Sequence, residues 1–264
     1  MKKVFLTASV ASLLLVTSCE KGDLNLLSIA DDIKLGQQSR DQVLADPAQF
    51  PVLSRTQYPA AYNYLESMKT TILNSGKVRY QTEFPWELYI IKDDNTQNAF
   101  CTPGGYIFIY TGLIKYLDNA SSLAGVMGHE MGHADRRHSS TQITKQYGVQ
   151  FVLDLLLGKN QNQLTQIGQQ LLSLQFSRTD ETDADNQSVV YLCPTKYRAA
   201  GAADFFQKII NSGASSPPQF LSTHPNPDNR VQNITSKATA ATCGNSISSQ
   251  EEQTDYTLFK NSLP

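Results

Sequence analysis

The stretch MGHEMGHADRRH, residues 127–138, sets two histidines four positions apart and places a glutamate directly after the first. Helical residues are rotated by about 100° each, so His129 and His133 differ by about 40° and leave the same face. Two imidazoles on one face can bind a single metal ion, and Glu130 borders that face at about 60° beyond His133. His138 would fall about 180° from His129 on a continuous helix, so we interpret it as structural.

Three glycines, Gly125, Gly128 and Gly132, lie on an adjacent face of the same predicted helix. Each costs about 1 kcal/mol relative to alanine, so a helix that keeps three of them is expected to pack its backbone closely against a neighbour. The helix is predicted from about Asn119 into the 140s, with Asn119 or Ser121 as its cap. A helix with merely exposed or hydrogen-bonded histidines is the alternative, because HExxH also occurs by chance.

A catalytic zinc site normally has three protein ligands and one open position. Besides the three histidines above, His224 is the only imidazole in the chain. The segment SRTDETDAD, residues 177–185, adds carboxylates on a second predicted helix, where Glu181 and Asp185 are four positions apart and can point the same way. Spacing alone does not choose between these two and the competing Asp180 and Asp183. A solvated acidic face is the other interpretation.

The N-terminus, MKKVFLTASVASLLLVTSCE, has two lysines before an apolar run from Val4 to Val16 that is short for a membrane span. Residues 1–18 are therefore predicted to be a signal peptide. The sequence before Cys19 resembles a bacterial lipobox, which implies a lipidated Cys19 and a lipid-anchored segment over residues 19–57. A plain signal peptide cut elsewhere is the alternative, and no later segment is long and apolar enough to span a bilayer.

The formal net charge of −2 gives no indication of nucleic-acid binding. Export permits disulfides, and three cysteines remain after Cys19. We predict a bond between Cys193 and Cys243. Cys101 lies in the apolar stretch AFCTPGG and is interpreted as a buried free thiol.

Further helices are predicted from apolar residues at three- and four-residue spacing. They cover a short amphipathic stretch over residues 26–38, and then about 59–74, 144–157, 164–174 and 177–192. The proline-rich segment 215–231 is expected to be mostly irregular.

Strands are predicted at about 86–92, 97–101 and 105–110, which together make a small sheet. The stretch FCTPGGYIF is interpreted as an edge strand opened by glycines, to which an extended peptide could add through backbone hydrogen bonds. This interpretation makes Gly104, Gly105 and Tyr106 substrate-binding candidates. A simple turn at the two glycines is the alternative.

HEMGH, followed 48 positions later by SRTDETDAD, resembles the pattern HExxH and SRxxExxAD of one zinc metallopeptidase family. This family includes the CaaX prenyl endopeptidases, the mitochondrial Oma-type protease and periplasmic proteases of outer-membrane quality control. The similarity extends to DDIKLGQQ, NAFCTPGGYIFIYTGLI and FLSTHPNPDNRV. It implies a predominantly helical α+β, zincin-like metallopeptidase domain over residues 58–264, with a small β-sheet next to the active-site helix.

The resemblance also implies site residues. One Zn²⁺ per chain is expected on His129, His133 and Glu181, with Glu130 as the catalytic carboxylate. Asp185 is expected to accept a hydrogen bond from a ligating histidine. Zinc would lower the pKa of a water molecule and polarise the scissile carbonyl, while Glu130 carries the proton to the departing amine.

His224 and Arg230 are further catalytic candidates, because STHPNPDNR resembles the family's tail motif. His224 could stabilise the oxyanion. It could instead fill the open coordination position and hold the enzyme silent, as its counterpart is thought to do in some similar proteases. A loop histidine that only packs is the third possibility.

The chain lacks the spanning helices of the membrane-embedded members, which favours the soluble periplasmic type and puts a prenylated substrate in doubt. We therefore expect an exported zinc endopeptidase of a Gram-negative bacterium, in the periplasm or lipid-anchored at the outer membrane. Its expected substrates are misfolded or unassembled envelope polypeptides, and outer-membrane assembly machinery is a possible partner. The alternatives are an envelope chaperone or assembly factor with a structural zinc and little proteolysis, and an anchored protein with a vestigial HExxH.

Overall fold

The computed structural model describes residues 25–156, 159, 167, 171–172, 174–212, 218–225, 229–244 and 249–264. The predicted signal peptide and Cys19 lie outside these residues, as does most of the helix predicted at 164–174. Within the described ranges, no helix combines the length and the apolar character needed to cross a bilayer.

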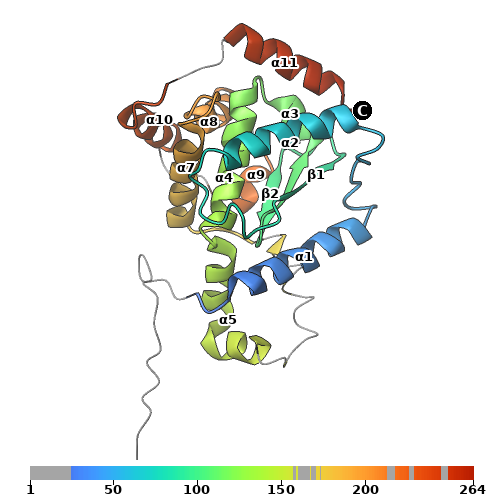
Figure 1. Cartoon of the computed structure of the whole chain (residues 1–264), viewed down its shortest axis with the longest axis vertical. Coiled ribbons are helices and arrows are strands. Elements are labelled where there is room, and N and C mark those ends of the chain that lie inside the picture. Colours follow the sequence, from blue (N-terminus) through green and yellow to red (C-terminus); the bar gives the residue numbers. More distant parts are fainter. Residues whose placement is uncertain are drawn as a thin grey trace, which may run out of the picture.

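Helices dominate the chain and surround one small sheet, as the predicted α+β, zincin-like class requires (Figure 1). The elements are α1 (Ile29–Ala45), α2 (Pro59–Leu73), β1 (Glu87–Ile91), β2 (Ala99–Thr102), β3 (Tyr106–Tyr110), α3 (Thr111–Tyr116), α4 (Ala120–Asp135), α5 (His138–Leu156), α7 (Arg178–Leu192), α8 (Gly201–Ser212), α9 (Phe220–Thr223), α10 (Arg230–Ala240) and α11 (Ser249–Asn261).

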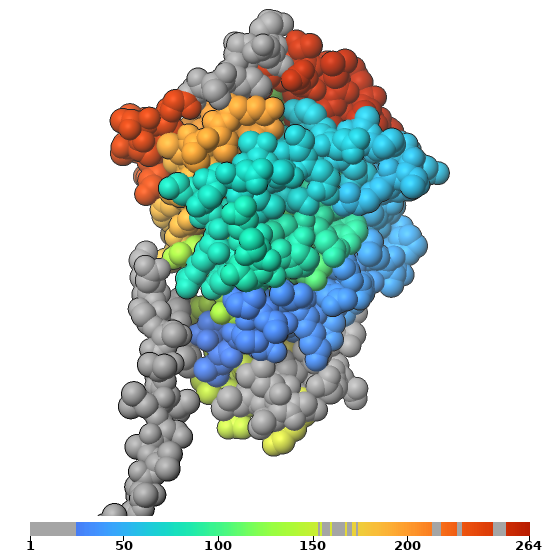
Figure 2. All heavy atoms as spheres, in the orientation of Figure 1, coloured from blue at the N-terminus to red at the C-terminus, as the bar shows by residue number. Residues whose placement is uncertain are grey.

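The sheet has the order β1-β3-β2, with β1 parallel and β2 antiparallel to β3. Every residue of β3 is buried. Ile107 and Ile109 join the main core, whereas Phe108 packs in a second cluster with Val43 of α1. The sheet is therefore covered on both faces, and α1 lies across one of them while its outer side stays at the surface (Figure 2).

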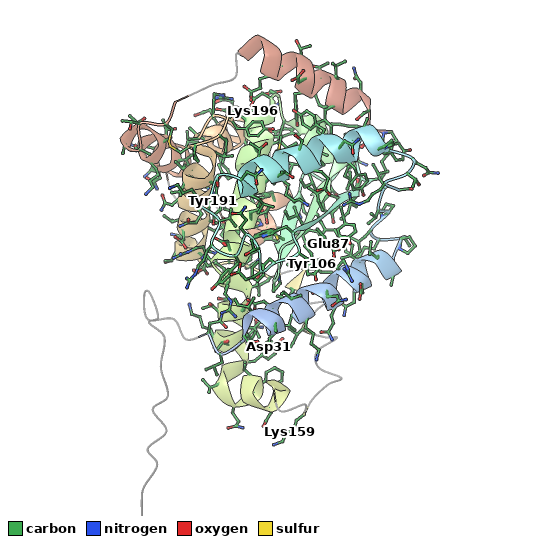
Figure 3. All side chains as sticks on the ribbon, in the orientation of Figure 1. Asp31, Glu87, Tyr106, Lys159, Tyr191 and Lys196 are labelled. Atoms are coloured by element: carbon green, nitrogen blue, oxygen red, sulfur yellow. A yellow bond between two sulfur atoms is a disulfide. The ribbon has the colours of Figure 1, made fainter. Side chains whose placement is uncertain are left out.

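The stretch FCTPGGYIF does not form the single edge strand that we expected. Residues 100–102 lie in β2, at the edge of the described sheet, whereas residues 106–108 lie in β3, which pairs on both sides. Gly104 and Gly105 form the turn into β3 with φ of +77° and +84°. A Cβ on Gly104 would lie 2.8 Å from Cα of Ile33 in α1. Tyr106 lies beside α1 (Figure 3) and is only 2% exposed. The glycines thus serve a tight turn beneath α1.

The α4 helix runs through the centre of the molecule, and all of its residues are buried (Figure 1). Asn119 is its cap, accepting the backbone N–H of Ser122. The three predicted glycines face α7 and α8. A Cβ on Gly125 would lie 2.1 Å from the backbone nitrogen of Ala202, and one on Gly132 would lie 3.2 Å from the carbonyl oxygen of Ala184. The predicted close backbone packing is confirmed.

The prediction of one helix from Asn119 into the 140s is wrong, because α4 ends at Asp135 and α5 begins at His138. Arg137 takes a left-handed backbone conformation between them, with φ of +59°. Its guanidinium forms an ion pair of 2.5 Å with Asp32 of α1 and donates a hydrogen bond to the carbonyl of Leu27, just before α1. The chain therefore turns sharply just after the HExxH motif.

The C-terminal tail folds into α10 and α11. Tyr256 and Phe259 of α11 enter the main core, and Tyr256 donates to the carbonyl of Ile114. The predicted disulfide between Cys193 and Cys243 is present, and Cys101 is a buried free thiol as expected. The bond joins the end of α7 to the chain that follows α10.

Candidate metal centre

Four side chains from three parts of the chain converge beside α4. His129 and His133 come from α4, Glu181 from α7, and His224 from the residue after α9. Each is at most 1% exposed, and one ligand atom from each lies within 4.8 Å of the others. The three residues expected to share a metal are thus brought together, and His224 joins them.

The spacing of these atoms fits an ion of the size of zinc. Nε2 of His133 lies 3.0 Å from Nε2 of His129 and 3.3 Å from Oε1 of Glu181. Bonds of about 2.0–2.1 Å in a tetrahedral zinc site separate neighbouring ligand atoms by about 3.3–3.4 Å. Oε2 of Glu181 makes no well-aligned hydrogen bond, and the nearest charged or polar nitrogens are Nη2 of Arg230 at 3.0 Å and Nε2 of His129 at 3.4 Å.

Burial and neighbouring charges set the protonation of these groups. Burial lowers the pKa of His133 well below its usual value, which favours the neutral form that binds metals. Burial and Arg230 lower the pKa of His129, but the neighbouring Asp185 and Glu181 carboxylates outweigh them and raise it to about 9. For Glu181, burial raises the pKa, and the neighbouring imidazoles, His129 foremost, outweigh burial and lower it. Glu181 is therefore a carboxylate.

Glu130 borders the cluster without belonging to the four. It is 1% exposed, and its Oε1 has no hydrogen-bond partner. That oxygen lies 3.4 Å from Nε2 of His224. Burial raises the pKa of the Glu130 carboxyl, which suits a group that must both take up and release a proton.

Asp185 and Arg230 contact the proposed ligands His129 and Glu181. Oδ1 of Asp185 lies 2.8 Å from Nδ1 of His129, on the side of the ring away from the cluster. Arg230 donates to both oxygens of Asp185, at 2.6 Å and 2.8 Å, and its Nη2 lies 3.0 Å from Oε2 of Glu181. These two residues can fix His129 and Glu181 in place.

Residues 59–238 match the model of Peptidase family M48. The chain belongs to this family. Its HExxH helix and its SRxxExxAD helix supply three of the four residues that converge in the cluster.

Three relatives show how far the similarity of this M48 peptidase extends. Mitochondrial metalloendopeptidase OMA1 of Arabidopsis thaliana is 32% identical over 142 residues, 53% of this chain and 29% of that protein. Beta-barrel assembly-enhancing protease of Yersinia pestis is 27% identical over 196 residues, 68% of this chain and 39% of that protein. Metalloprotease LoiP of Escherichia coli is 28% identical over 251 residues, 90% of this chain and 97% of that protein. The chain thus spans less than half of the first two and nearly all of the third.

The four carboxylates of α7 have different partners. Asp180 forms a capping box with Ser177, in which each accepts the backbone N–H of the other. Asp183 pairs with Arg136 at 2.8 Å. Neither Asp180 nor Asp183 is among the four residues of the cluster. Glu181 belongs to it, and Asp185 contacts His129.

Three residues beside the cluster were not predicted. Phe176 stacks on the His133 ring at 3.9 Å, and Phe220 stacks on the His224 ring at 4.2 Å. A continuous helix would point His138 away from the cluster. Instead, its Nδ1 lies 3.0 Å from Nδ1 of His133. The two phenylalanines lie next to the motifs SRTDETDAD and STHP in the sequence. This proximity was the signal that could have placed them near the cluster.

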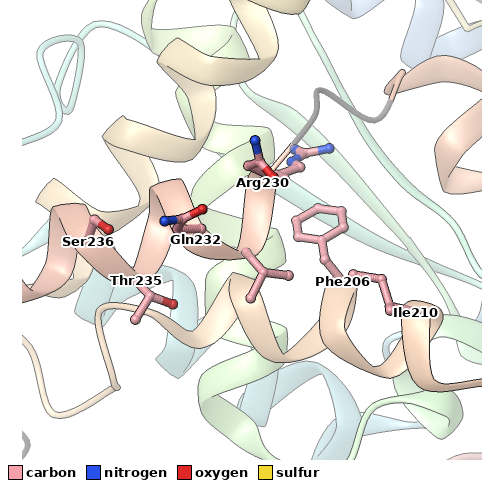
Figure 4. Close-up of a pocket in the computed structure, with 8 residues that line it drawn as sticks. Phe206, Ile210, Arg230, Gln232, Thr235 and Ser236 are labelled. Atoms are coloured by element: carbon pink, nitrogen blue, oxygen red, sulfur yellow. The ribbon is translucent and has the colours of Figure 1, made fainter.

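Arg230 also lines a surface pocket of about 470 Å³ between α8 and α10 (Figure 4). Its guanidinium carbon lies 3.9 Å from the centroid of the Phe206 ring, which forms part of the wall. Nη1 of Arg230 is buried and has no hydrogen-bond partner. The pocket is thus joined to the metal cluster through one side chain. Gly104, Gly105 and Tyr106, by contrast, lie under α1 and are not among the four residues of the cluster.

Proposed function

We propose that this M48 peptidase is a zinc-dependent endopeptidase of the Gram-negative cell envelope that cleaves misfolded or unassembled envelope proteins. The observation that carries the proposal is the buried convergence of His129, His133 and Glu181, with Glu130 at its border. The likeness to Metalloprotease LoiP over nearly its whole length supports an endopeptidase of this size. The name Beta-barrel assembly-enhancing protease supports a partner in outer-membrane assembly.

His129, His133 and Glu181 would hold a zinc ion, which would supply Lewis acidity for activating water and polarising the scissile carbonyl. Glu130 accepts the proton of the attacking water and delivers it to the departing amine. Asp185 keeps the Nδ1 proton of His129 in place, so that Nε2 of this ring stays free for the metal.

His224 and Arg230 have different places in this proposal. Nδ1 of His224 lies 3.4 Å from Nε2 of His129, where it can occupy the fourth coordination position and keep substrate out. Arg230 holds Asp185 and Glu181 from behind, and its unpartnered Nη1 is the atom available to a developing oxyanion.

The substrate is an extended polypeptide, and β2 is the strand where it would add. β2 (Ala99–Thr102) is an edge strand of the described sheet and contacts α4, whereas β3 has strands on both sides. We therefore move the expected peptide-binding edge from Gly104, Gly105 and Tyr106 to β2. The signal peptide over residues 1–18, the lipid on Cys19, the anchored segment 19–57 and a peptidase domain over residues 58–264 remain part of the proposal.

Cleavage of casein by wild type and Glu130→Gln tests this function, with zinc content measured on the same samples. We expect the variant to retain zinc and to lose about 100-fold or more of its rate, because a general base contributes about that much. Exposed Glu83, changed to Gln, is the matched control and should cleave like wild type. A wild type that binds zinc, binds unfolded clients and cleaves none of them would support the chaperone function instead.

A further inference from the structure

The partner of His133 on the side away from the cluster is another histidine. A histidine that binds a metal through one ring nitrogen donates the N–H of the other to a fixed acceptor, which sets its tautomer. For His129 this acceptor is the Asp185 carboxylate at 2.8 Å. For His133 the same place is taken by Nδ1 of His138, at 3.0 Å.

His138 in turn has an acceptor of its own. Its Nε2 lies 3.3 Å from Oδ2 of Asp183, and the oxygen of Asp180 is further away at 3.9 Å. Asp183 is fixed by Arg136, whose Nε donates to Oδ2 at 2.8 Å. His138 is 7% exposed and His133 is fully buried, so little water competes for these bonds.

The arrangement of the two rings determines where their protons lie. Two imidazoles that meet through their Nδ1 atoms need one donor and one acceptor. A proton on Nε2 of His138 satisfies Asp183 and leaves Nδ1 of His138 as an acceptor. His133 then carries its proton on Nδ1, and its Nε2 faces Oε1 of Glu181 with a free lone pair. The reverse assignment would protonate Nε2 of His133 and leave the Asp183 carboxylate facing a lone pair.

The turn after α4 brings His138 to this place. At about 100° per residue, a continued helix would point His138 away from His133, and the left-handed Arg137 returns it. Arg137 is anchored to Asp32 of α1, and α1 lies near the junction of α4 and α5 (Figure 1). The sequence HEMGHADRRH thus encodes a third histidine near the site through a break in the helix.

We propose that His138 is a positioning residue for the metal centre, accepting the Nδ1 proton of His133 and donating its own Nε2 proton to Asp183. This inference rests on the proposed role of His133 as a metal ligand. The chain gives its two ligating histidines two different supports: a carboxylate behind His129, and a histidine backed by a carboxylate behind His133. Loss of such a support typically weakens metal binding by about 10–100-fold.

Zinc affinity of the full chain, measured by competition with a chelator, separates this role from mere packing. His138→Leu fills similar space without an acceptor, and we expect zinc to bind it about 10–100-fold more weakly. His138→Asn places an amide oxygen near the position of Nδ1 and should regain most of that loss. Tyr62→Phe, which removes a buried hydroxyl that donates to Leu53 and accepts from Ile90, is the control and should bind zinc like wild type. Wild-type affinity in both His138 variants would overturn the proposal.

Histidine ¹⁵N NMR of the zinc-loaded wild type needs no variant and remains decisive if His138→Leu does not fold. We expect the proton of His133 on Nδ1 and that of His138 on Nε2. A proton on Nδ1 of His138, or a doubly protonated ring, would overturn the inference. If wild type binds no zinc, or His133→Ala binds it normally, the proposed function fails first, which is a different result.

Discussion

Nδ1 of His224 lies 3.0 Å from Oε1 of Glu181. The same ring reaches toward Glu130 through Nε2, at 3.4 Å, so one imidazole contacts both a proposed ligand and the proposed base. Phe220 and Phe176 stack on its faces, at 4.2 Å and 5.5 Å, and hold it there. Among the three roles considered for His224, this geometry favours the closing of the fourth coordination position.

His224→Ala is therefore expected to raise the rate of peptide cleavage, because it opens that position and frees Glu130. Steady-state kinetics on a casein-derived peptide would show the change, with His224→Phe as a variant that keeps the stacking and removes the nitrogens. A fall in kcat at constant KM would instead assign His224 to the oxyanion, and no change would leave it a packing residue.

The approach of α4 to α8 makes Gly125 the most sensitive of the three glycines. A Cβ there would meet the backbone nitrogen of Ala202 at 2.1 Å, and backbone cannot move aside as a side chain can. We expect Gly125→Ala to destabilise the fold by about 2 kcal/mol or more, since overpacking typically costs about 1–3 kcal/mol. A Cβ on Gly128 would come nearest the hydroxyl of Ser188, at 3.0 Å, with the Cα of Ser188 at 3.4 Å, so Gly128→Ala should cost less. Urea denaturation of both variants measures the difference, and equal stability would contradict the contact.

The disulfide should stabilise the fold by limiting the unfolded chain. Cys193 and Cys243 are 50 positions apart, and closing a loop of that size contributes about 4 kcal/mol. We expect a double Cys193→Ser, Cys243→Ser variant to unfold at clearly lower urea concentration than wild type. Cys101→Ala removes the buried free thiol and serves as a control that keeps the bond. A double variant as stable as the wild type would show that the bond constrains little.

The ion pair between Asp32 and Arg137 links the N-terminal helix to the turn below the metal centre. Its carboxylate is 1% exposed, and the hydroxyl of Ser140 also donates to it. We expect Asp32→Ala to lower stability and to weaken zinc binding, because the left-handed turn that places His138 loses its anchor. Thermal melts with and without zinc measure both effects. Arg40→Ala, which breaks a separate α1 ion pair to Glu87, should leave zinc affinity unchanged.

His129 and His133 could be predicted to share one face from the sequence alone, because helical geometry is local. The positions of His129 and His133 follow from 3.6 residues per turn, and nothing beyond α4 is needed to bring them together. Glu181 could not be singled out by spacing alone, because α7 carries four carboxylates within six residues of one another. The structure removes the competitors, since Asp180 is engaged in the local capping box with Ser177 and Asp183 forms a tertiary ion pair with Arg136.

The place of His138 could not be read from the sequence because it depends on a helix break at Arg137. A left-handed arginine has no local signal of the kind that glycine gives, and its anchor, Asp32, lies more than a hundred residues away in the chain. The burial of β3 on both faces, in contrast, had a signal in the sequence. The run YIFIY is apolar without alternation, which is typical of a strand buried on both faces.

The most direct test of the account is the zinc content of purified wild type, His133→Ala and Glu181→Ala, measured by elemental analysis after dialysis. We predict one zinc per wild-type chain and little or none in either variant, because the proposed site needs both side chains. Both variants should retain helical circular dichroism, which shows that the loss of metal is local. Full zinc occupancy in folded Glu181→Ala would contradict the claim that this carboxylate shares an ion with the two imidazoles of α4.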